Sequence, residues 1–274
     1  MNFFSTKALQ LSAVFAILRR FQNPFLVILL RVGFIKMPYF PYRLRNGTRV
    51  FTMLARPTTT SMADLFVLRE VLLDETYRDV LPFLKRGQLR VVDIGANLGS
   101  FTLWLHHKAG IREAHCFEPE PDSFRLLQFN LSKNDCSFAQ TYPFAIGGEE
   151  RTAQISLSRS SPGASSIYRA APKELSTTTI RVASFEQWLK GLNGNFDLLK
   201  MDCEGAEWEI IQKTDPKQLR RFNVFVAEVH GDPLNKNSIQ DFKPLIEGVG
   251  FRTIRWDAHA QGLYVGVRDS QDAQ

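Results

Sequence analysis

From residue 88 onward, short apolar runs alternate with amphipathic segments, which is the pattern of a parallel β-sheet covered by helices. The predicted strands of the first half are Leu89–Ile94, Glu113–Phe117 and Thr141–Ile146. The helices predicted between them are Ser100–Lys108 and Asp122–Lys133. Because each strand is followed by a helix, the pattern predicts an α/β domain.

The same pattern resumes after an interruption at residues 149–183. The elements expected there are strands at Phe196–Met201 and Asn223–Val229, a helix at Gln240–Glu247, and a closing strand pair at Phe251–Trp256 and Gly262–Val267. Within the interruption, two strand-like runs, Ala153–Ser158 and Thr177–Val182, flank the Ser160–Ser166 segment. We expect an inserted hairpin or lid over the site. Ser184–Gln187 fits a capping box that starts a short helix through Leu189.

The segment before residue 61 has a different character. Its predicted elements are helices at Leu9–Phe21 and Pro24–Phe34, and a hairpin over Tyr39–Phe51 with Asn46-Gly47 as its two-residue turn. A helix at Asp64–Leu73 and a segment at Tyr77–Lys85 lead into the sheet. We therefore divide the chain into an appendage, residues 1–60, and an α/β domain, residues 61–274, with residues 149–183 as an insertion.

Positive charge is concentrated in the appendage. Between Met1 and Ala63 there are nine basic residues and no acidic one, which leaves 25 basic and 28 acidic residues in the remainder. Because an enzyme acting on nucleic acid usually carries its positive charge around the active-site cleft, we expect no nucleic-acid substrate. Three cysteines without a CxxC pair indicate a reducing, cytoplasmic location. The composition does not set the oligomeric state.

Two interpretations of the N-terminal residues stay open. The longest apolar run, Phe25–Leu30, is far shorter than the ~20 residues of a membrane span. The amphipathic segments either pack on the α/β domain, or attach residues 1–35 peripherally to an anionic membrane at its inner face.

A glycine-bearing turn follows the first predicted strand, with Asp93 before it and Gly95, Asn97 and Gly99 within it. Glycines let the backbone turn sharply and approach a ligand closely, and the amides that begin the next helix point toward it. The G-x-G-x-x-G fingerprint of dinucleotide enzymes is absent, because Asn97 stands where the second glycine would be. An acidic residue before the turn suits a cationic ligand, which favours S-adenosylmethionine (SAM).

Glu118 ends the second predicted strand, 25 residues after Asp93. An acidic side chain at this place can accept hydrogen bonds from both ribose hydroxyls of a nucleoside. The turn and Glu118 together predict a SAM site along Asp93, Gly95, Ala96, Asn97, Gly99 and Glu118.

The chain resembles the FkbM-type family of SAM-dependent methyltransferases. The residues that carry this resemblance are Asp93–Asn97 with Gly99, Phe117–Pro121 with Phe124 and Asn130, Ala145–Gly148, Lys200–Glu207 and Glu228–His230. The resemblance implies a Rossmann-like class I methyltransferase fold, with a seven-stranded, mostly parallel sheet whose last strand is antiparallel. It also implies methyl transfer to a hydroxyl of a sugar or glycan, polyketide or other small molecule, and adds Glu70, Tyr77 and Ala145 to the cofactor site. Tyr77 would lie against the sulfonium by cation–π attraction, or serve only in packing.

Acidic residues follow the fourth predicted strand, at the edge of the sheet where ligands bind. Asp202 and Glu204 either orient the acceptor and act as base, or cap the helix that follows; Asp202 can also contact the SAM ammonium. His230, which ends the fifth strand after Glu228, is the favoured base near neutral pH. A divalent cation on Asp202, Glu228 and His230 is an alternative that the spacing does not favour, so no metal is expected.

Other functions would also fit parts of this pattern. A SAM-binding interaction protein without catalysis would keep the glycine turn and Glu118, but would not need the acidic residues near Asp202. An N-methyltransferase would keep both the glycine turn with Glu118 and the acidic residues near Asp202. The missing glycine pattern disfavours a nicotinamide-dependent oxidoreductase.

Overall fold

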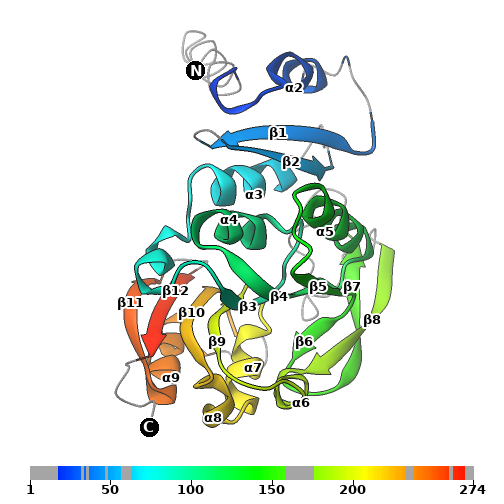
Figure 1. The fold of residues 1–274 in the computed structure, drawn as a ribbon. Helices are drawn as coiled ribbons and strands as arrows, with labels where there is room; N and C mark the ends of the chain where they lie inside the picture. The colour runs from blue at the N-terminus through cyan, green and yellow to red at the C-terminus, as the bar shows by residue number, and fades with distance from the viewer. Residues whose placement is uncertain are drawn as a thin grey trace, which may run out of the picture.

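A computed structural model of the chain describes residues 18–31, 34, 37–46, 49–56, 63–157, 176–232, 237–258 and 262–268. Figure 1 shows a seven-stranded sheet at its centre, with the strand order β11-β12-β10-β9-β3-β4-β5. The strands are β3 (Leu89–Ile94), β4 (Ile111–Phe117), β5 (Ala139–Tyr142), β9 (Phe196–Met201), β10 (Phe222–Val229), β11 (Phe251–Asp257) and β12 (Gly262–Arg268). Only β12 runs antiparallel to its neighbours in this sheet, so the predicted topology is confirmed.

Helices cover both faces of this sheet. One face carries α3 (Ala63–Leu72), α4 (Ser100–Ala109) and α5 (Pro121–Lys133), and the other carries α6 (Phe185–Lys190), α7 (Glu207–Lys213), α8 (Pro216–Leu219) and α9 (Phe242–Val249). Alternate strand residues serve the two cores: Val91 and Leu198 pack toward α3–α5, whereas Val92 and Leu199 pack toward the opposite helices. Burial of both faces explains why successive positions such as Val91-Val92 and Leu198-Leu199 are apolar in the central strands.

The predicted strand Thr141–Ile146 is wrong as a single element. The chain forms β5, which ends at Tyr142, and then β6 (Ala145–Gly147), which belongs to a second sheet of order β6-β8-β7. Pro143 lies between them, and because proline has no N–H to donate, it ends the pairing in the main sheet. The expected inserted hairpin forms from β7 (Arg151–Leu157) and β8 (Ser176–Ser184), which pair antiparallel. The Ser160–Ser166 segment and its role as a lid lie outside the described residues.

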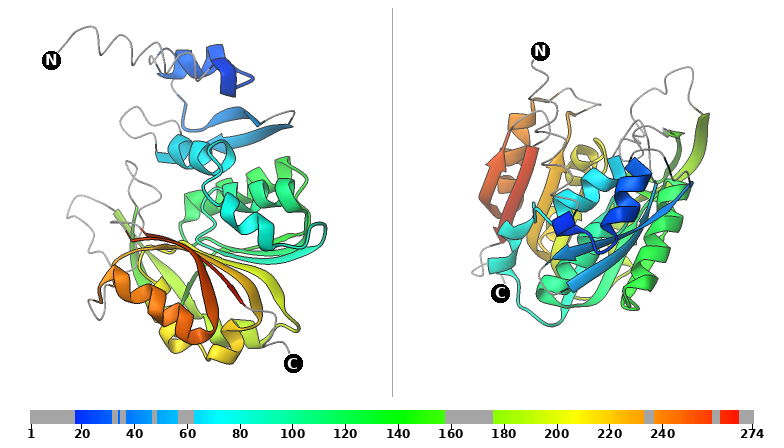
Figure 2. Two further views of the ribbon diagram at one scale, coloured as in Figure 1. Left: turned by 90° about the vertical axis from the view of Figure 1, so that its left-hand side faces the viewer. Right: turned by 90° about the horizontal axis from the view of Figure 1, so that it is seen from above.

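An N-terminal layer stacks on the α3–α5 side of the molecule, as Figure 2 shows from the side and from above. It consists of α2 (Pro24–Arg31), β1 (Phe40–Asn46) and β2 (Arg49–Ala55). The predicted hairpin forms, but Asn46 pairs with Arg49 and so lies in the strand rather than in the turn. Of the helix predicted over Leu9–Phe21, only residues 18–20 are described as helical. No helix among the described residues is long and apolar enough to cross a membrane.

Asparagine side chains close both outer edges of this hairpin. Asn130 accepts a hydrogen bond from Leu54 N at 2.7 Å and donates one to Leu54 O at 3.1 Å, and Asn134 makes the same pair of bonds with Thr52. These asparagines lie one turn apart on α5, which matches the two-residue repeat along an edge of β2. Asn23 bonds to the backbone of β1 in a similar way. The hairpin is therefore docked on α5 through backbone groups of β2 that would otherwise lack partners in the sheet.

Candidate active site

The glycine-bearing turn between β3 and α4 is packed against the neighbouring strands. Gly95 N and Ala96 N both donate to Phe117 O at the end of β4, at 3.0 and 2.9 Å. Gly95 has a φ of 75°, and a Cβ built on it would lie 1.8 Å from the carbonyl oxygen of Asp202. Gly99 also has a positive φ and faces a leucine of α5. The turn therefore approaches the end of β9 so closely that only glycine fits at position 95.

A buried lysine of β9, Lys200, bonds to the glycine-bearing turn. Lys200 Nζ donates to Gly95 O at 2.7 Å and lies 3.2 Å from Asp93 Oδ1 and 3.7 Å from Asp202 Oδ2. Burial alone would lower the pKa of Lys200, but the negative charges of Asp93 and Asp202 raise it above its ordinary value. Asp93 is itself fully buried, and its other oxygen, Oδ2, accepts a hydrogen bond from the Thr102 hydroxyl. We therefore expect Asp93 to support cofactor binding through the turn that Lys200 holds.

Glu118 and Asn97 lie together at the open side of the turn. Asn97 N donates to Glu118 Oε2 at 2.9 Å, and Glu120 N donates to Glu118 Oε1 at 2.8 Å. Burial raises the pKa of Glu118 to about 7, although these backbone donors lower it. Asn97 Oδ1 is buried without a hydrogen-bond partner among the described residues. Its unused acceptor and the remaining lone pairs of Glu118 fit a ligand with hydroxyl or amino donors.

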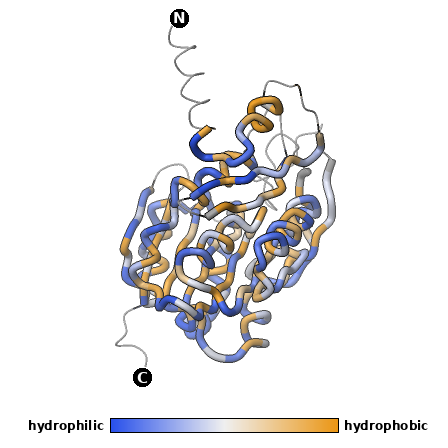
Figure 3. Tube along the Cα trace, turned by 45° about the horizontal axis from the view of Figure 1, so that its top comes forward, coloured by the Kyte–Doolittle hydropathy of each residue, from blue (hydrophilic) through white to orange (hydrophobic). Residues whose placement is uncertain are grey.

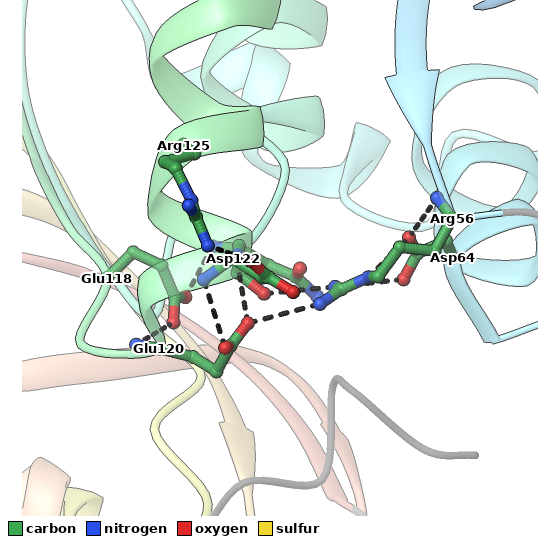
Figure 4. A network of polar contacts seen from close by, with 8 residues as sticks. Arg56, Asp64, Glu118, Glu120, Asp122 and Arg125 are labelled. Atoms are coloured by element: carbon green, nitrogen blue, oxygen red, sulfur yellow. Dashed lines mark hydrogen bonds and ion pairs between the residues drawn. The ribbon is translucent and has the colours of Figure 1, made fainter. Parts of the chain in front are cut away.

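The loop after Glu118 is tied to the N-terminal layer, as Figure 4 shows. Arg56 at the end of β2 lies 3.0 Å from Asp64 Oδ2 and 3.1 Å from Glu120 Oε2, and it also donates to Ser123. Glu120 caps α5 by accepting from the backbone of Ser123 at 2.7 Å. The contacts of Arg56 therefore connect the hairpin to the residue that follows the proposed ribose site.

Three carboxylates from separate elements surround Tyr77. They belong to Glu70 on α3, Asp202 after β9 and Glu228 on β10, and all three raise the pKa of Tyr77, whose burial is the largest cause. The Tyr77 hydroxyl donates to Glu228 Oε1, and its ring packs edge-on against Phe101 at 5.0 Å. The negative charge of Asp202 and then burial raise the pKa of Glu228 to about 7. Burial and Asp202 also raise the pKa of Glu70.

His230 is buried between two other carboxylates. Its Nδ1 lies 3.3 Å from Glu207 Oε1, and its Nε2 lies 3.7 Å from Glu204 Oε2. Burial alone would lower the pKa of His230, but the hydrogen bond and charge of Glu207, followed by the charges of Asp202 and Glu204, raise it to about 9. The imidazole is therefore protonated at neutral pH, where it cannot accept a proton.

The loop before α7 is shaped by Glu207. This fully buried carboxylate accepts from Cys203 N at 2.8 Å and from Gly205 N at 2.9 Å, so it fixes the loop as well as His230. Glu204 takes a positive φ of 55° within that loop. No set of three or more histidine, cysteine or acidic side chains in the described parts of the chain is arranged to hold a metal ion.

The sheet topology, the turn and the acidic ends of β9 and β10 agree with a match to a known family. The model of the methyltransferase FkbM domain matches residues 93–253, more than half of the chain. This chain belongs to the FkbM methyltransferase family.

Relatives of this FkbM-family methyltransferase are distant in sequence. Methyltransferase 1 of Beauveria bassiana (strain ARSEF 2860) is 25% identical over 221 residues, which cover 73% of this chain and 86% of the relative. The 31-O-demethyl-FK506 methyltransferase FkbM of Streptomyces tacrolimicus is 24% identical over 263 residues, covering 84% and 95%. The crystal structure of methyltransferase FkbM from Methylobacillus flagellatus KT aligns with a TM-score of 0.46 at 16% identity, over 68% of this chain and 47% of that one.

The FkbM-family site assembles most of the residues singled out in the sequence, but in three groups. Asp93, Gly95, Ala96, Asn97, Gly99 and Glu118 form the turn side, and Glu70, Tyr77, Asp202 and Glu228 form an acidic side, joined to the first by Lys200. Glu204 and His230 form a pair beside the acidic side. Ala145 begins β6 and is buried in the small apolar cluster of the second sheet. The roles of these residues in binding and catalysis stay predictions.

Three residues of the site were not assigned by the sequence analysis. Lys200 and Glu207 lie within the matched motif but had no stated role, and Arg56 lies in the appendage. A lysine in the otherwise apolar end of β9 was the one available signal, because a buried cation requires an anionic partner.

Proposed function

We propose that this FkbM-family methyltransferase transfers the methyl group of SAM to a hydroxyl oxygen of a small-molecule or glycan acceptor. The observation that carries the proposal is Glu228, a half-buried carboxylate with a pKa of about 7 at the carboxyl end of β10. A hydroxyl must lose its proton when it is methylated, and a base whose pKa is near the working pH serves this best. The relative from Streptomyces tacrolimicus, whose name specifies methylation at an oxygen, supports the same reaction type.

The turn side would hold SAM. Glu118 would accept from the ribose hydroxyls, and Asn97 Oδ1 would accept from a further donor of the cofactor. The chemistry that SAM supplies is an activated methyl group on a sulfonium. Glu70 and Asp202 on the acidic side outnumber the nearby cation Lys200, so this side is complementary to the positive charge of SAM.

The acidic side would receive the acceptor. The Tyr77 hydroxyl fixes one oxygen of Glu228, which leaves the other oxygen to take the acceptor's proton. Asp202 keeps the pKa of Glu228 raised, so that Glu228 is basic enough to accept that proton near neutral pH. His230, which the sequence favoured as base, would act instead as a cation that orients Glu204.

We expect Glu228→Gln to lower kcat by about 100- to 10,000-fold while SAM affinity changes little, because the amide preserves shape but cannot act as base. The acceptor for the assay is the unmethylated compound that accumulates when the gene is deleted, identified by mass spectrometry of extracts. The rising limb near pH 7 in kcat/KM for the acceptor, measured at saturating SAM, should disappear in this variant.

His230→Gln is the matched comparison, and thermal unfolding shows whether either variant is folded. Full activity of Glu228→Gln together with loss of activity in folded His230→Gln would return the role of base to His230.

We expect SAM affinity to fall as the pH decreases below about 7, because protonation of Glu118 removes an acceptor from the ribose site. Since the raised pKa belongs to a carboxyl group, the binding form is the one present above that pKa. The dissociation constant should rise by about tenfold in all as the pH falls from 8 to 6, and then level off near the value of Glu118→Gln, measured by isothermal titration calorimetry.

Glu118→Gln serves as the control, because its SAM affinity should be weaker at pH 8 and nearly independent of pH. An unchanged pH profile in this variant would show that another group, not Glu118, controls cofactor binding.

Calorimetry with SAM and with NAD tests the cofactor itself. Binding of SAM and not of NAD is expected, and absence of SAM binding at high micromolar concentrations would overturn the proposed function. Methylation at nitrogen in the isolated product would leave the cofactor site intact but refute a hydroxyl acceptor.

A further inference from the structure

The helix α2 has an apolar face that the described part of the chain does not cover. Phe25, Leu26 and Leu29 are 73%, 47% and 40% exposed, whereas Val27 is 2% exposed. At 3.6 residues per turn, the three exposed positions lie within about a third of the helix circumference, opposite the side that Val27 buries. Figure 3 shows α2 as a strongly hydrophobic element at the top of the molecule. The helix therefore packs through one side and presents apolar side chains on the other.

Further exposed apolar residues lie beside α2 in the chain. Six of the nine large hydrophobic side chains that are most exposed among the described residues fall between positions 18 and 37; they are Leu18, Phe25, Leu26, Leu29, Phe34 and Met37. We call this set the N-terminal apolar patch. Scattered exposed apolar residues are ordinary on a soluble protein, but a concentration of this kind in one short segment indicates an interaction surface.

Positive charge accompanies the N-terminal apolar patch. Arg19 is exposed next to it, and Arg43 and Arg45 are exposed on β1 of the same layer. Every charged side chain between Met1 and Ala63 is basic, nine in all. Asp74 pairs with Arg20 at 3.1 Å, whereas Arg19, Arg43 and Arg45 are exposed. Apolar side chains beside exposed arginines are complementary to an anionic lipid surface.

Much of the backbone edge on both sides of the hairpin is already bonded within the chain. Asn23 bonds to the backbone of β1, and Asn130 and Asn134 bond to the backbone of β2. A partner that adds a strand to this layer would have to displace those bonds. What the layer presents to its surroundings is apolar side chains with basic neighbours.

We propose that the N-terminal apolar patch binds the surface of an anionic lipid bilayer. Phe25, Leu29 and Phe34 enter the boundary between headgroups and acyl chains, and the exposed arginines of the layer contact lipid phosphates. The enzyme is thereby held at the membrane without spanning it. This inference does not depend on the proposed methyl acceptor, because it concerns a different layer of the molecule.

Sedimentation of the full-length chain with vesicles tests the inference. We expect the protein to pellet with vesicles of phosphatidylcholine and phosphatidylserine, and much less with phosphatidylcholine alone. Phe25→Ser/Leu29→Ser should lower binding at least tenfold, and it should stay folded because both side chains are exposed. Phe66→Ser, which changes a 60% exposed phenylalanine on α3, is the matched control and should bind like the wild type.

Arg43→Gln/Arg45→Gln should reduce the preference for anionic vesicles. Its vesicle binding should also depend less on salt concentration than that of the wild type. Pelleting of Phe25→Ser/Leu29→Ser at the wild-type level would overturn the proposal, as would failure of the wild type to bind either vesicle. Analytical ultracentrifugation tests whether a second copy of this chain occupies the patch instead. A dimer that dissociates in Phe25→Ser/Leu29→Ser, with no vesicle binding by the wild type, would identify a second copy of this chain instead of lipid.

Discussion

Gly95→Ala is expected to abolish measurable SAM binding and to destabilise the fold by more than about 3 kcal/mol. The new Cβ would lie 1.8 Å from the carbonyl oxygen of Asp202, a backbone atom that no side-chain rotation can move away. The positive φ of 75° adds conformational strain for any residue with a side chain. Relief of the clash requires separation of the turn from the end of β9, which dismantles the site. Urea unfolding and calorimetry with SAM measure the two effects.

Gly87→Ala separates the clash from the strain. Gly87 also has a positive φ, 113°, but a Cβ there would meet nothing within 4 Å. We expect it to be destabilised by about 1 kcal/mol and to bind SAM normally. If Gly95→Ala behaved like Gly87→Ala, the close approach of the turn to β9 would not be required for the cofactor site.

Lys200→Met is expected to destabilise the folded chain by about 3–5 kcal/mol, because it leaves the buried carboxylate of Asp93 without its cation. Lys200 is 3% exposed, and its ammonium also donates to Gly95 O, so the change also removes a hydrogen bond that stabilises the turn. The side chain of methionine nearly fills the same volume, which keeps a cavity from dominating the effect. The free energy of unfolding in urea measures the loss.

The double variant Asp93→Asn/Lys200→Met tests the reason for that loss. Neutralising Asp93 removes the uncompensated charge, so the double variant should be more stable than Lys200→Met alone, although Asp93→Asn by itself is destabilising. Additive effects of the two substitutions would mean that the ion pair between Asp93 and Lys200 contributes little to stability.

The central strands were predictable because burial on both faces imposes a simple pattern. β3 and β9 have the predicted bounds, since each is an apolar run with a clear polar or glycine boundary. The division of Thr141–Ile146 into β5 and β6 was missed, because Tyr142 and Ala145 are both compatible with one strand and only the sheet partners tell them apart. The turn position in the N-terminal hairpin was also missed, because Asn46 is as suited to a turn as to the strand end it occupies.

The candidate site was predictable where its residues are close in sequence. The turn from Asp93 to Gly99 and the position of Glu118 follow from local motifs. The bond between Tyr77 and Glu228 joins residues 151 positions apart, so no local pattern contains it. The charge state of His230 likewise depends on Glu207, which comes from the helix after a different strand. Electrostatic roles of this kind require the assembled sheet edge.

Asn130 has a consequence for how this chain can diverge during evolution. Its amide donates both to Leu54 O in the N-terminal hairpin and to Leu98 O in the glycine-bearing turn, at 3.1 and 3.0 Å, while its oxygen accepts from Leu54 N. Aspartate has no amide donor, and glutamine is one methylene longer, so neither reproduces all three bonds. Substitution of Asn130 is therefore constrained by two parts of the protein at once. A lineage that lost the hairpin would still keep the restriction from the turn, whereas Asn134, whose contacts reach only the hairpin and its own helix, would be released to vary.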